Sequence, residues 1–125
     1  MRNSRLRTPS NADLIDTDTS GERCLQGDPI VLWRGNSAKT EQVALSNAQG
    51  APIAHLSWPA GQSQLAVPSQ NFDQGNDYLL QRGNKSVSLR VHKMPTSAAD
   101  NPAARAAWMA QSGCKAQALQ VLQAL

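Results

Sequence analysis

Short apolar runs separated by turn-forming residues dominate the middle of this chain, between Pro52 and His92. Large apolar residues recur there at alternate positions, and Gly, Pro, Asn and Asp lie between the runs. Alternation with a period of two is typical of strands with one buried face, and clustered turn formers indicate tight connections. The pattern therefore predicts small antiparallel strands rather than helices.

The same pattern, followed along the chain, predicts about six short strands. They cover residues 29–34, 42–46, 52–58, 63–67, 77–82 and 86–92. In the last of these, Val87, Leu89 and Val91 alternate with polar residues, and the pair Gly83-Asn84 before it suits a two-residue hairpin turn. Because no helical pattern separates the strands, we predict a mainly β fold built as an antiparallel β-sandwich.

The pattern changes to a helical one in the C-terminal part of the chain, residues 95–125. After a linker, Asp100 or Asn101 can cap a helix with Pro102 in its first turn. Gly113 is a suitable left-handed stop, and a second helix follows it. We therefore predict a short helical hairpin, or one kinked helix.

Each predicted helix carries an apolar stripe. The stripes consist of Ala104, Ala107, Trp108 and Met109 on the first helix, and of Ala118, Leu119, Val121, Leu122 and Leu125 on the second. An apolar stripe must be buried against another surface. We expect the hairpin to pack on the sandwich. The alternative is an interaction surface for a protein partner, formed by Trp108, Leu119, Leu122 and Leu125.

Residues 1–23 are polar and contain only Leu6, Leu14 and Ile15 as large apolar side chains. Burial of three such side chains offers about 5–9 kcal/mol, whereas ordering this many backbone units costs roughly 20–40 kcal/mol. The prediction is a disordered leader over 1–23, a sandwich over 24–94, and a linker with the helical hairpin over 95–125.

Charge and hydropathy exclude two classes of partner. The net charge is +3 and the basic residues are scattered, except for Arg2, Arg5 and Arg7, which an acidic group follows. We therefore expect no nucleic-acid binding. No stretch of about eighteen apolar residues exists, so we expect no membrane insertion. No secretory signal is visible, which indicates either a cytoplasmic protein or a true start upstream, the latter favouring the periplasm or envelope.

Cys24 and Cys114 are the two cysteines of the chain. A disulfide between them would close a loop of about ninety residues, stabilise the fold by about 4–5 kcal/mol, and imply an oxidising compartment. The alternative is a pair of free or buried thiols. A zinc site is not expected, because His55 and His92 are the only histidines and have no ligand spacing.

No motif for nucleophilic, metal-dependent or phosphate chemistry occurs, so we expect no enzyme and no cofactor. His55 and His92 are expected on the solvent faces of their strands. Trp33 and Trp58 are expected between the sheets of the sandwich. Exposed tryptophans would instead indicate an interface or a sugar site.

Three motifs carry a resemblance to a known family. They are P-x-x-x-x-x-W-P-x-G (Pro52, Trp58, Pro59, Gly61), F-x-x-G-x-x-Y-x-L (Phe72, Gly75, Tyr78, Leu80) and V-x-L-x-V (Val87, Leu89, Val91). Together they resemble the fibronectin type III and Ig-like modules of bacterial envelope proteins, in particular the sandwich that follows a FecR-type domain. The closing residues 107–125 resemble the helical tail of such proteins and, through Gly113, Ala118 and Leu122, one tetratricopeptide hairpin.

The resemblance implies no catalytic residues. It implies a non-catalytic protein-interaction or scaffolding module of a bacterial envelope or signalling system. The alternative is a module that binds carbohydrate or another small ligand through exposed aromatic residues.

Overall fold

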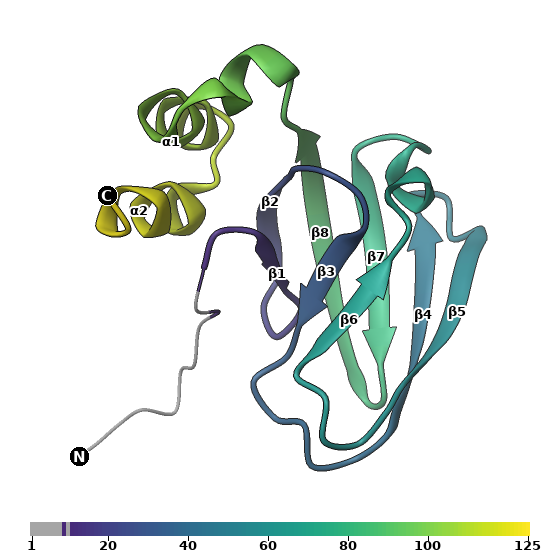
Figure 1. Ribbon diagram of the computed structural model, residues 1–125. Helices are drawn as coiled ribbons and strands as arrows, with labels where there is room; N and C mark the ends of the chain where they lie inside the picture. Colours follow the sequence, from purple (N-terminus) through teal and green to yellow (C-terminus); the bar gives the residue numbers. More distant parts are fainter. Residues whose placement is uncertain (1–8, 10) are drawn as a thin grey trace.

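Two β-sheets and a pair of C-terminal helices form the protein in the computed structural model, which describes residue 9 and residues 11–125 (Figure 1). The strands are β1 (Leu14–Asp16), β2 (Gly21–Leu25), β3 (Ile30–Trp33), β4 (Glu41–Asn47), β5 (Pro52–Trp58), β6 (Gln64–Val67), β7 (Asp77–Arg82) and β8 (Lys85–Lys93). The helices are the short 3-10 turns η1 (Ser69–Phe72) and η2 (Thr96–Asp100), followed by α1 (Pro102–Gln111) and α2 (Lys115–Gln123). The fold is thus mainly β, and its helical pair follows the last strand.

The strands divide into a three-stranded sheet, β1-β3-β6, and a five-stranded sheet, β2-β8-β7-β4-β5. The main core contains buried residues of both sheets, among them Leu32 of β3, Val43 of β4, and Val87, Leu89 and Val91 of β8. The alternation in β8 therefore places its apolar side chains in the core, as predicted. All six predicted strands are present within one or two residues of their predicted ends.

The sheets are mixed rather than purely antiparallel. β1 runs parallel to β3, with Leu14 opposite Val31, and β2 runs parallel to β8, with Gly21 opposite Leu89. The other pairings in the described chain are antiparallel. The parallel pairs arise because residues 17–20 carry the chain from one sheet to the other, so that its first part adds one edge strand to each.

This first part corrects the prediction of a disordered leader. Residues 11–23 are ordered in β1, β2 and their connection, and the prediction is wrong for them, whereas residues 1–8 and 10 lie outside the described part. Ile15 is buried in the main core, and the Thr17 hydroxyl donates to the Trp33 carbonyl oxygen at 2.8 Å. The prediction compared the cost of ordering with apolar burial alone. It left out the stabilisation that comes from backbone pairing with β3 and β8 and from these polar contacts.

A tyrosine fixes the loop that enters β7. The Tyr78 hydroxyl donates to the Gly75 carbonyl oxygen at 2.9 Å and accepts from the Gln74 N–H at 3.0 Å. Its ring meets Phe72 edge to face, with centroids 5.3 Å apart. Burial raises the pKa of Tyr78, against the lowering effect of the hydrogen bond from Gln74. Phe72 therefore closes the end of the core, as predicted.

A buried group of charges lies around Trp58. Glu41 Oε1 accepts from Arg34 Nη1 at 2.8 Å and from Arg82 Nη1 at 2.6 Å, and Arg82 Nη2 donates to Asp18 Oδ1 at 2.5 Å. The Arg34 guanidinium carbon lies 4.9 Å from the centroid of the Trp58 ring. These contacts join residues that belong to β4, β5, β7 and the segments after β1 and β3, so the two sheets are tied together here.

Candidate interaction site on the helical hairpin

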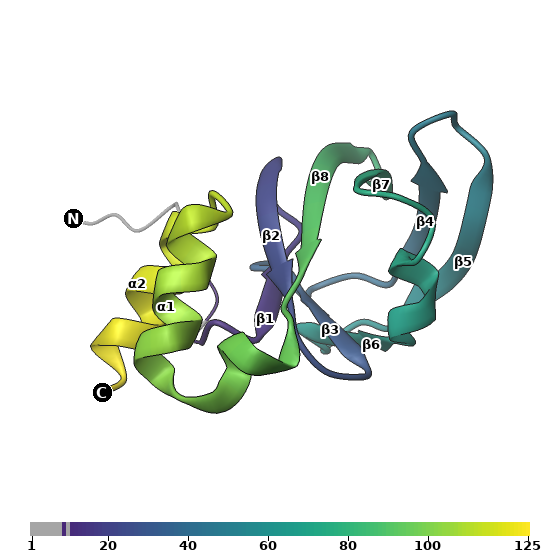
Figure 2. The same ribbon diagram turned by 90° about the horizontal axis from the view of Figure 1, so that it is seen from above.

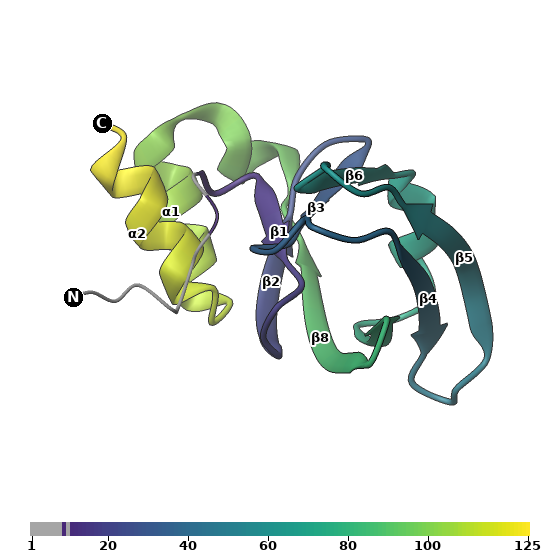
Figure 3. The same ribbon diagram turned by 90° about the horizontal axis from the view of Figure 1, so that it is seen from below.

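The helical hairpin is attached to the sheets by a disulfide. Cys24 of β2 is bonded to Cys114, which directly precedes α2, and their Cα atoms are 6.1 Å apart. Both cysteines are buried, and no free cysteine occurs in the described chain. The predicted pairing is confirmed. Figures 2 and 3 show both helices beside β1 and β2, far from β5.

A glutamine adds a second attachment. Oε1 of Gln117 accepts from the Cys24 N–H at 2.8 Å, and its Nε2 donates to the carbonyl oxygens of Cys24 at 2.9 Å and Ala12 at 2.8 Å. β2 is the edge strand of its sheet, so these backbone groups face away from β8. The Gln117 amide therefore pairs with the strand edge in place of a further strand. In the sequence, the only signal for burial of Gln117 was its position on the same side of the helix as Ala118 and Val121.

A small second core lies between the helices and the sheet edge. Its buried members are Ala12, Cys24, Ala106, Met109, Cys114, Ala118 and Val121. Asn101 caps α1 through its side chain, which accepts from the Ala104 N–H at 2.8 Å. Gly113 adopts a φ of 90° between the helices, as the predicted left-handed stop requires. The hairpin thus packs on the edge of the five-stranded sheet, against β2.

The predicted interaction residues do not share one environment. Leu119, Leu122 and Leu125 are 55%, 50% and 75% exposed, and we call these three residues the leucine face. Trp108 instead packs, partly buried, against the second core. Because Gln117 faces the sheet, Leu119 and Leu122 lie on the exposed side of α2, and Leu125 lies two residues beyond the end of the helix.

Charge is scarce around the leucine face. Residues 101–125 contain no acidic residue, and their only basic residues are Arg105 and Lys115. Arg105 is already paired, since its Nη2 lies 3.0 Å from Asp13 Oδ1. A solvated helix usually carries charged residues on its outer side. This exposed surface, with few charges and three leucines, has the composition of an interface core.

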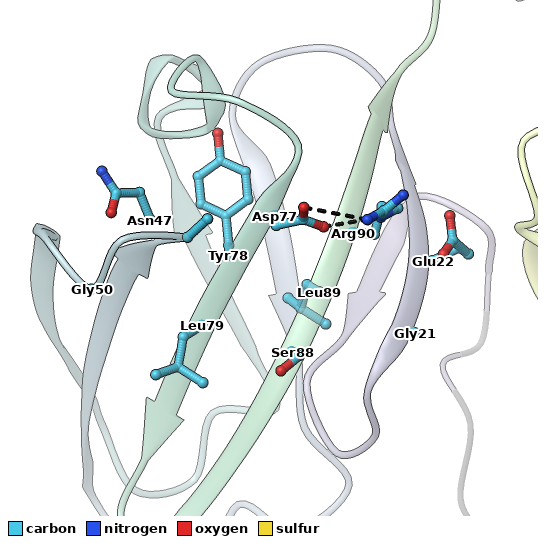
Figure 4. Close-up of a pocket in the computed structure, with 11 residues that line it drawn as sticks. Gly21, Glu22, Asn47, Gly50, Asp77, Tyr78, Leu79, Ser88, Leu89 and Arg90 are labelled. Atoms are coloured by element: carbon cyan, nitrogen blue, oxygen red, sulfur yellow. Dashed lines mark hydrogen bonds and ion pairs between the residues drawn. The ribbon is translucent and has the colours of Figure 1, made fainter.

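A groove of about 560 Å³ lies on the outer face of the five-stranded sheet. Figure 4 shows Asp77 and Arg90 joined across it, with Leu79 and Ser88 on neighbouring strands. Arg90 Nε donates to Asp77 Oδ1 at 2.9 Å, so the two charges neutralise each other. Glu22 also lines this groove, and its carboxylate lies against His92.

A smaller groove, of about 230 Å³, lies where α2 meets β2. Its lining includes Glu22, Arg23, Lys115 and Gln120. Burial lowers the pKa of Arg23, although the nearby Asp16 and Glu22 charges act in the opposite direction. Acidic and basic groups are mixed here, so the groove selects neither anions nor cations.

The remaining predicted site residues are separated. Trp33 and Trp58 are buried, as expected of residues between the sheets. His55 is exposed on the outer face of β5, and His92 Nε2 lies 2.5 Å from Glu22 Oε1. Among residues 9 and 11–125, no three acidic, histidine or cysteine side chains gather as a metal site would require.

No helix in the described part of the chain is both long enough and apolar enough to cross a membrane. Comparison with protein-family models, with curated proteins and with solved structures finds no match to this chain.

Proposed function

We propose that this protein is a non-catalytic, disulfide-stabilised interaction module that binds an apolar helix of a protein partner along α2. The observation that carries the proposal is the leucine face: Leu119, Leu122 and Leu125 stand exposed on a hairpin that a disulfide and Gln117 hold in place. A ridge of residues spaced by three fits the groove of another helix. A rigid support reduces the entropy cost of binding.

We further propose that the scaffold is an Ig-like sandwich of the fibronectin kind. In support, the neighbouring strands β8-β7-β4-β5 follow the order G-F-C-C′, and β3-β6 corresponds to the B-E pair. Tyr78 begins the strand equivalent to F and bonds back to Gly75, as the tyrosine corner of such domains does. The parallel pairing of β1 with β3 is a departure from the antiparallel arrangement.

An oxidising compartment fits this module best, and we propose the bacterial periplasm or envelope. The support is the Cys24–Cys114 disulfide, since such bonds persist mainly outside reducing cytoplasm. The alternative, a sugar or small-ligand site on exposed aromatic residues, has less support. Trp33, Trp58, Phe72 and Tyr78 are all buried, which leaves Trp108 as the one partly exposed ring of the chain.

A photo-cross-linking experiment tests the proposed helix contact. A photoreactive residue at Leu119 is expected to give a discrete adduct with one partner in cells that express the full chain. The same residue at Gln81, which is exposed on the outer face of β7, serves as the control and is expected to give none.

A second substitution decides whether the adduct depends on the leucine face. Leu122→Asp should reduce its yield at least about tenfold, because a desolvated charge is unfavourable in an apolar interface. Thermal melting should show that this half-exposed position leaves the fold intact. Equal yields from positions 81 and 119, or an adduct insensitive to Leu122→Asp, would rule out α2 as the binding site.

A further inference from the structure

We propose that two copies of this chain associate by pairing their β5 strands antiparallel, edge to edge, into one continuous sheet. β5 (Pro52–Trp58) is the last strand of the five-stranded sheet and has β4 on one side only. Figures 2 and 3 show it at the end of the molecule farthest from the helices. The contact would therefore be separate from the leucine face.

The hydrogen bonds around β4 identify the free groups of β5. The Gly83 N–H donates to the Gln42 carbonyl oxygen, so the backbone N–H and C=O of Gln42 point toward β7. The Asn47 N–H donates to the carbonyl oxygen of Ala51, so the backbone of Asn47 points toward β5. Backbone groups alternate in direction along a strand. Val43 and Leu45 therefore bond to β5, where their partners are Leu56 and Ala54. The backbone groups of His55 and Ser57 consequently point away from β4, toward the open edge, whereas Ile53 is the extra residue of a bulge opposite Leu45 and Ser46.

The main core is incompletely covered on this side. The partly buried apolar residues that pack against it are Ile53, Ala54, Leu56 and Leu65. The first three belong to β5, and Leu65 belongs to β6, which ends the other sheet on the same side. The core is thus closed everywhere in the described chain except between the two far edges, where half-exposed side chains leave apolar area for a partner to bury.

The same region lacks charge. From residue 42 to residue 72, between Glu41 and Asp73, the chain contains no Asp, Glu, Lys or Arg. Natural edge strands are usually protected from pairing by charged residues, prolines or a covering element. β5 has Pro52 at its first position and no formal charge. Charge depletion is also the compositional mark of an interface core.

The opposite edge of the same sheet provides an internal comparison. At β2, α2 covers the edge, and the Gln117 amide bonds the free backbone groups of Cys24. No such side chain bonds the free groups of β5 in the described structure. Among the strands that end a sheet, β5 has seven residues, whereas β1, β2 and β6 have three, five and four. β5 is therefore the longest of these edges, and its proline and its bulge are confined to its first two residues, Pro52 and Ile53.

A second copy is the occupant that these features fit. His55 is the middle residue of β5 and its backbone groups face the open edge, so a two-fold axis through His55 lets the two copies of this residue exchange backbone bonds. Ile53 would then lie opposite Ser57 of the second copy. Ala54 would lie opposite Leu56 on the core side, which buries the half-exposed apolar groups of both copies.

Sedimentation velocity of the full chain over a wide concentration range tests the proposal. We expect a monomer–dimer equilibrium. His55→Lys and His55→Glu should each raise the dissociation constant at least about tenfold, because like charges would lie directly opposite one another. An equimolar mixture of the two variants should recover the dimer, since opposite charges then meet. The control Gln81→Lys places the same charge on the outer face of β7, away from the edge, and should change nothing.

Three results would overturn the proposal. They are a wild-type chain that stays monomeric at all concentrations, a dimer that His55→Lys leaves unchanged, and a mixture of variants that does not reassociate. A dimer that is lost with Leu122→Asp but kept with His55→Lys would place self-association on α2 instead. Recovery of the dimer in the mixture would also show that both variants are folded and that each had lost only the contact between copies.

Discussion

At the scale of single residues, the charged group around Trp58 depends on the pairing of Arg34. Arg34 has a side chain that is 0% exposed, and removing a guanidinium from water is costly unless its donors are satisfied. Its Nε donates to the Gln62 carbonyl at 3.1 Å, Nη1 to Glu41 at 2.8 Å and Nη2 to the Pro59 carbonyl at 2.9 Å. Glu41 supplies the one negative charge among these acceptors, so the pairing should depend on pH.

Glu41→Gln tests this dependence. Burial raises the pKa of Glu41, but the hydrogen bonds and charges of Arg82 and Arg34 outweigh it and hold the pKa below the ordinary 4.5. A carboxylate with a depressed pKa stabilises the fold above its unfolded pKa and loses that contribution as pH falls through the folded value. At neutral pH the variant should therefore lose about 1–3 kcal/mol of unfolding free energy.

Urea denaturation at neutral pH and at about pH 2 measures this difference. The loss in Glu41→Gln should become smaller as the pH falls, because the wild-type carboxylate takes up protons and progressively loses the charge that the variant lacks at every pH. An equal loss at both pH values would contradict an electrostatic role for Glu41.

At the scale of elements, Gln117 decides which side of α2 faces the sheet. Its amide has the donor and acceptor of a peptide group, so it can complete the hydrogen bonds of an edge strand. The apolar stripe alone would favour burial of Leu119 and Leu122. Burying Gln117 with Ala118 and Val121 instead leaves those leucines exposed. One polar residue thus sets the orientation of the whole helix.

Gln117→Leu tests the amide contact. The substitution keeps similar volume but leaves the N–H and C=O of Cys24 unpaired, which should lower the free energy of unfolding by about 1–3 kcal/mol. Hydrogen exchange at the Cys24 amide should become faster in the variant. The control Gln123→Leu alters an exposed residue of the same helix and is expected to change stability by less than about 0.5 kcal/mol. Unchanged exchange at Cys24 would contradict the contact.

Local patterns were sufficient for most elements and insufficient for two aspects of the fold. The period-two alternation and the turn residues predicted the strands from β3 to β8, and the Asn101 cap and Gly113 predicted the ends of the helices. The strands β1 and β2 could not be predicted in this way, since distant strands provide their pairing. The orientation of α2 could not be predicted either, because the partner of Gln117 lies at Cys24, far away in the sequence.

At the scale of the whole molecule, β2, near the start of the described chain, is bonded to elements near its end. β2 pairs with β8, and Cys24 is bonded to Cys114 across a sequence separation of 90. A cross-link over so long a loop restricts the unfolded chain strongly in the chain-entropy account. The stability of the two sheets and the position of the hairpin should therefore both depend on this bond.

The double variant Cys24→Ala/Cys114→Ala measures that dependence. We expect the free energy of unfolding to fall by about 2–5 kcal/mol. Chemical denaturation of the variant and the wild type, each without reductant, provides the comparison. Reduced wild-type protein should behave like the variant, which serves as the control. Equal midpoints for oxidised and variant protein would show that hairpin packing alone holds the molecule together.

The disulfide has a consequence for an encounter with a protease. Nearly three quarters of the peptide bonds lie between Cys24 and Cys114, and one cut at any of them leaves two fragments still covalently joined. A nick in an exposed connection, such as residues 48–51, would pass unseen on a non-reducing gel and appear as two bands only after reduction. Molecules cut in this way keep both fragments, and thus their shape, and remain mixed with intact molecules.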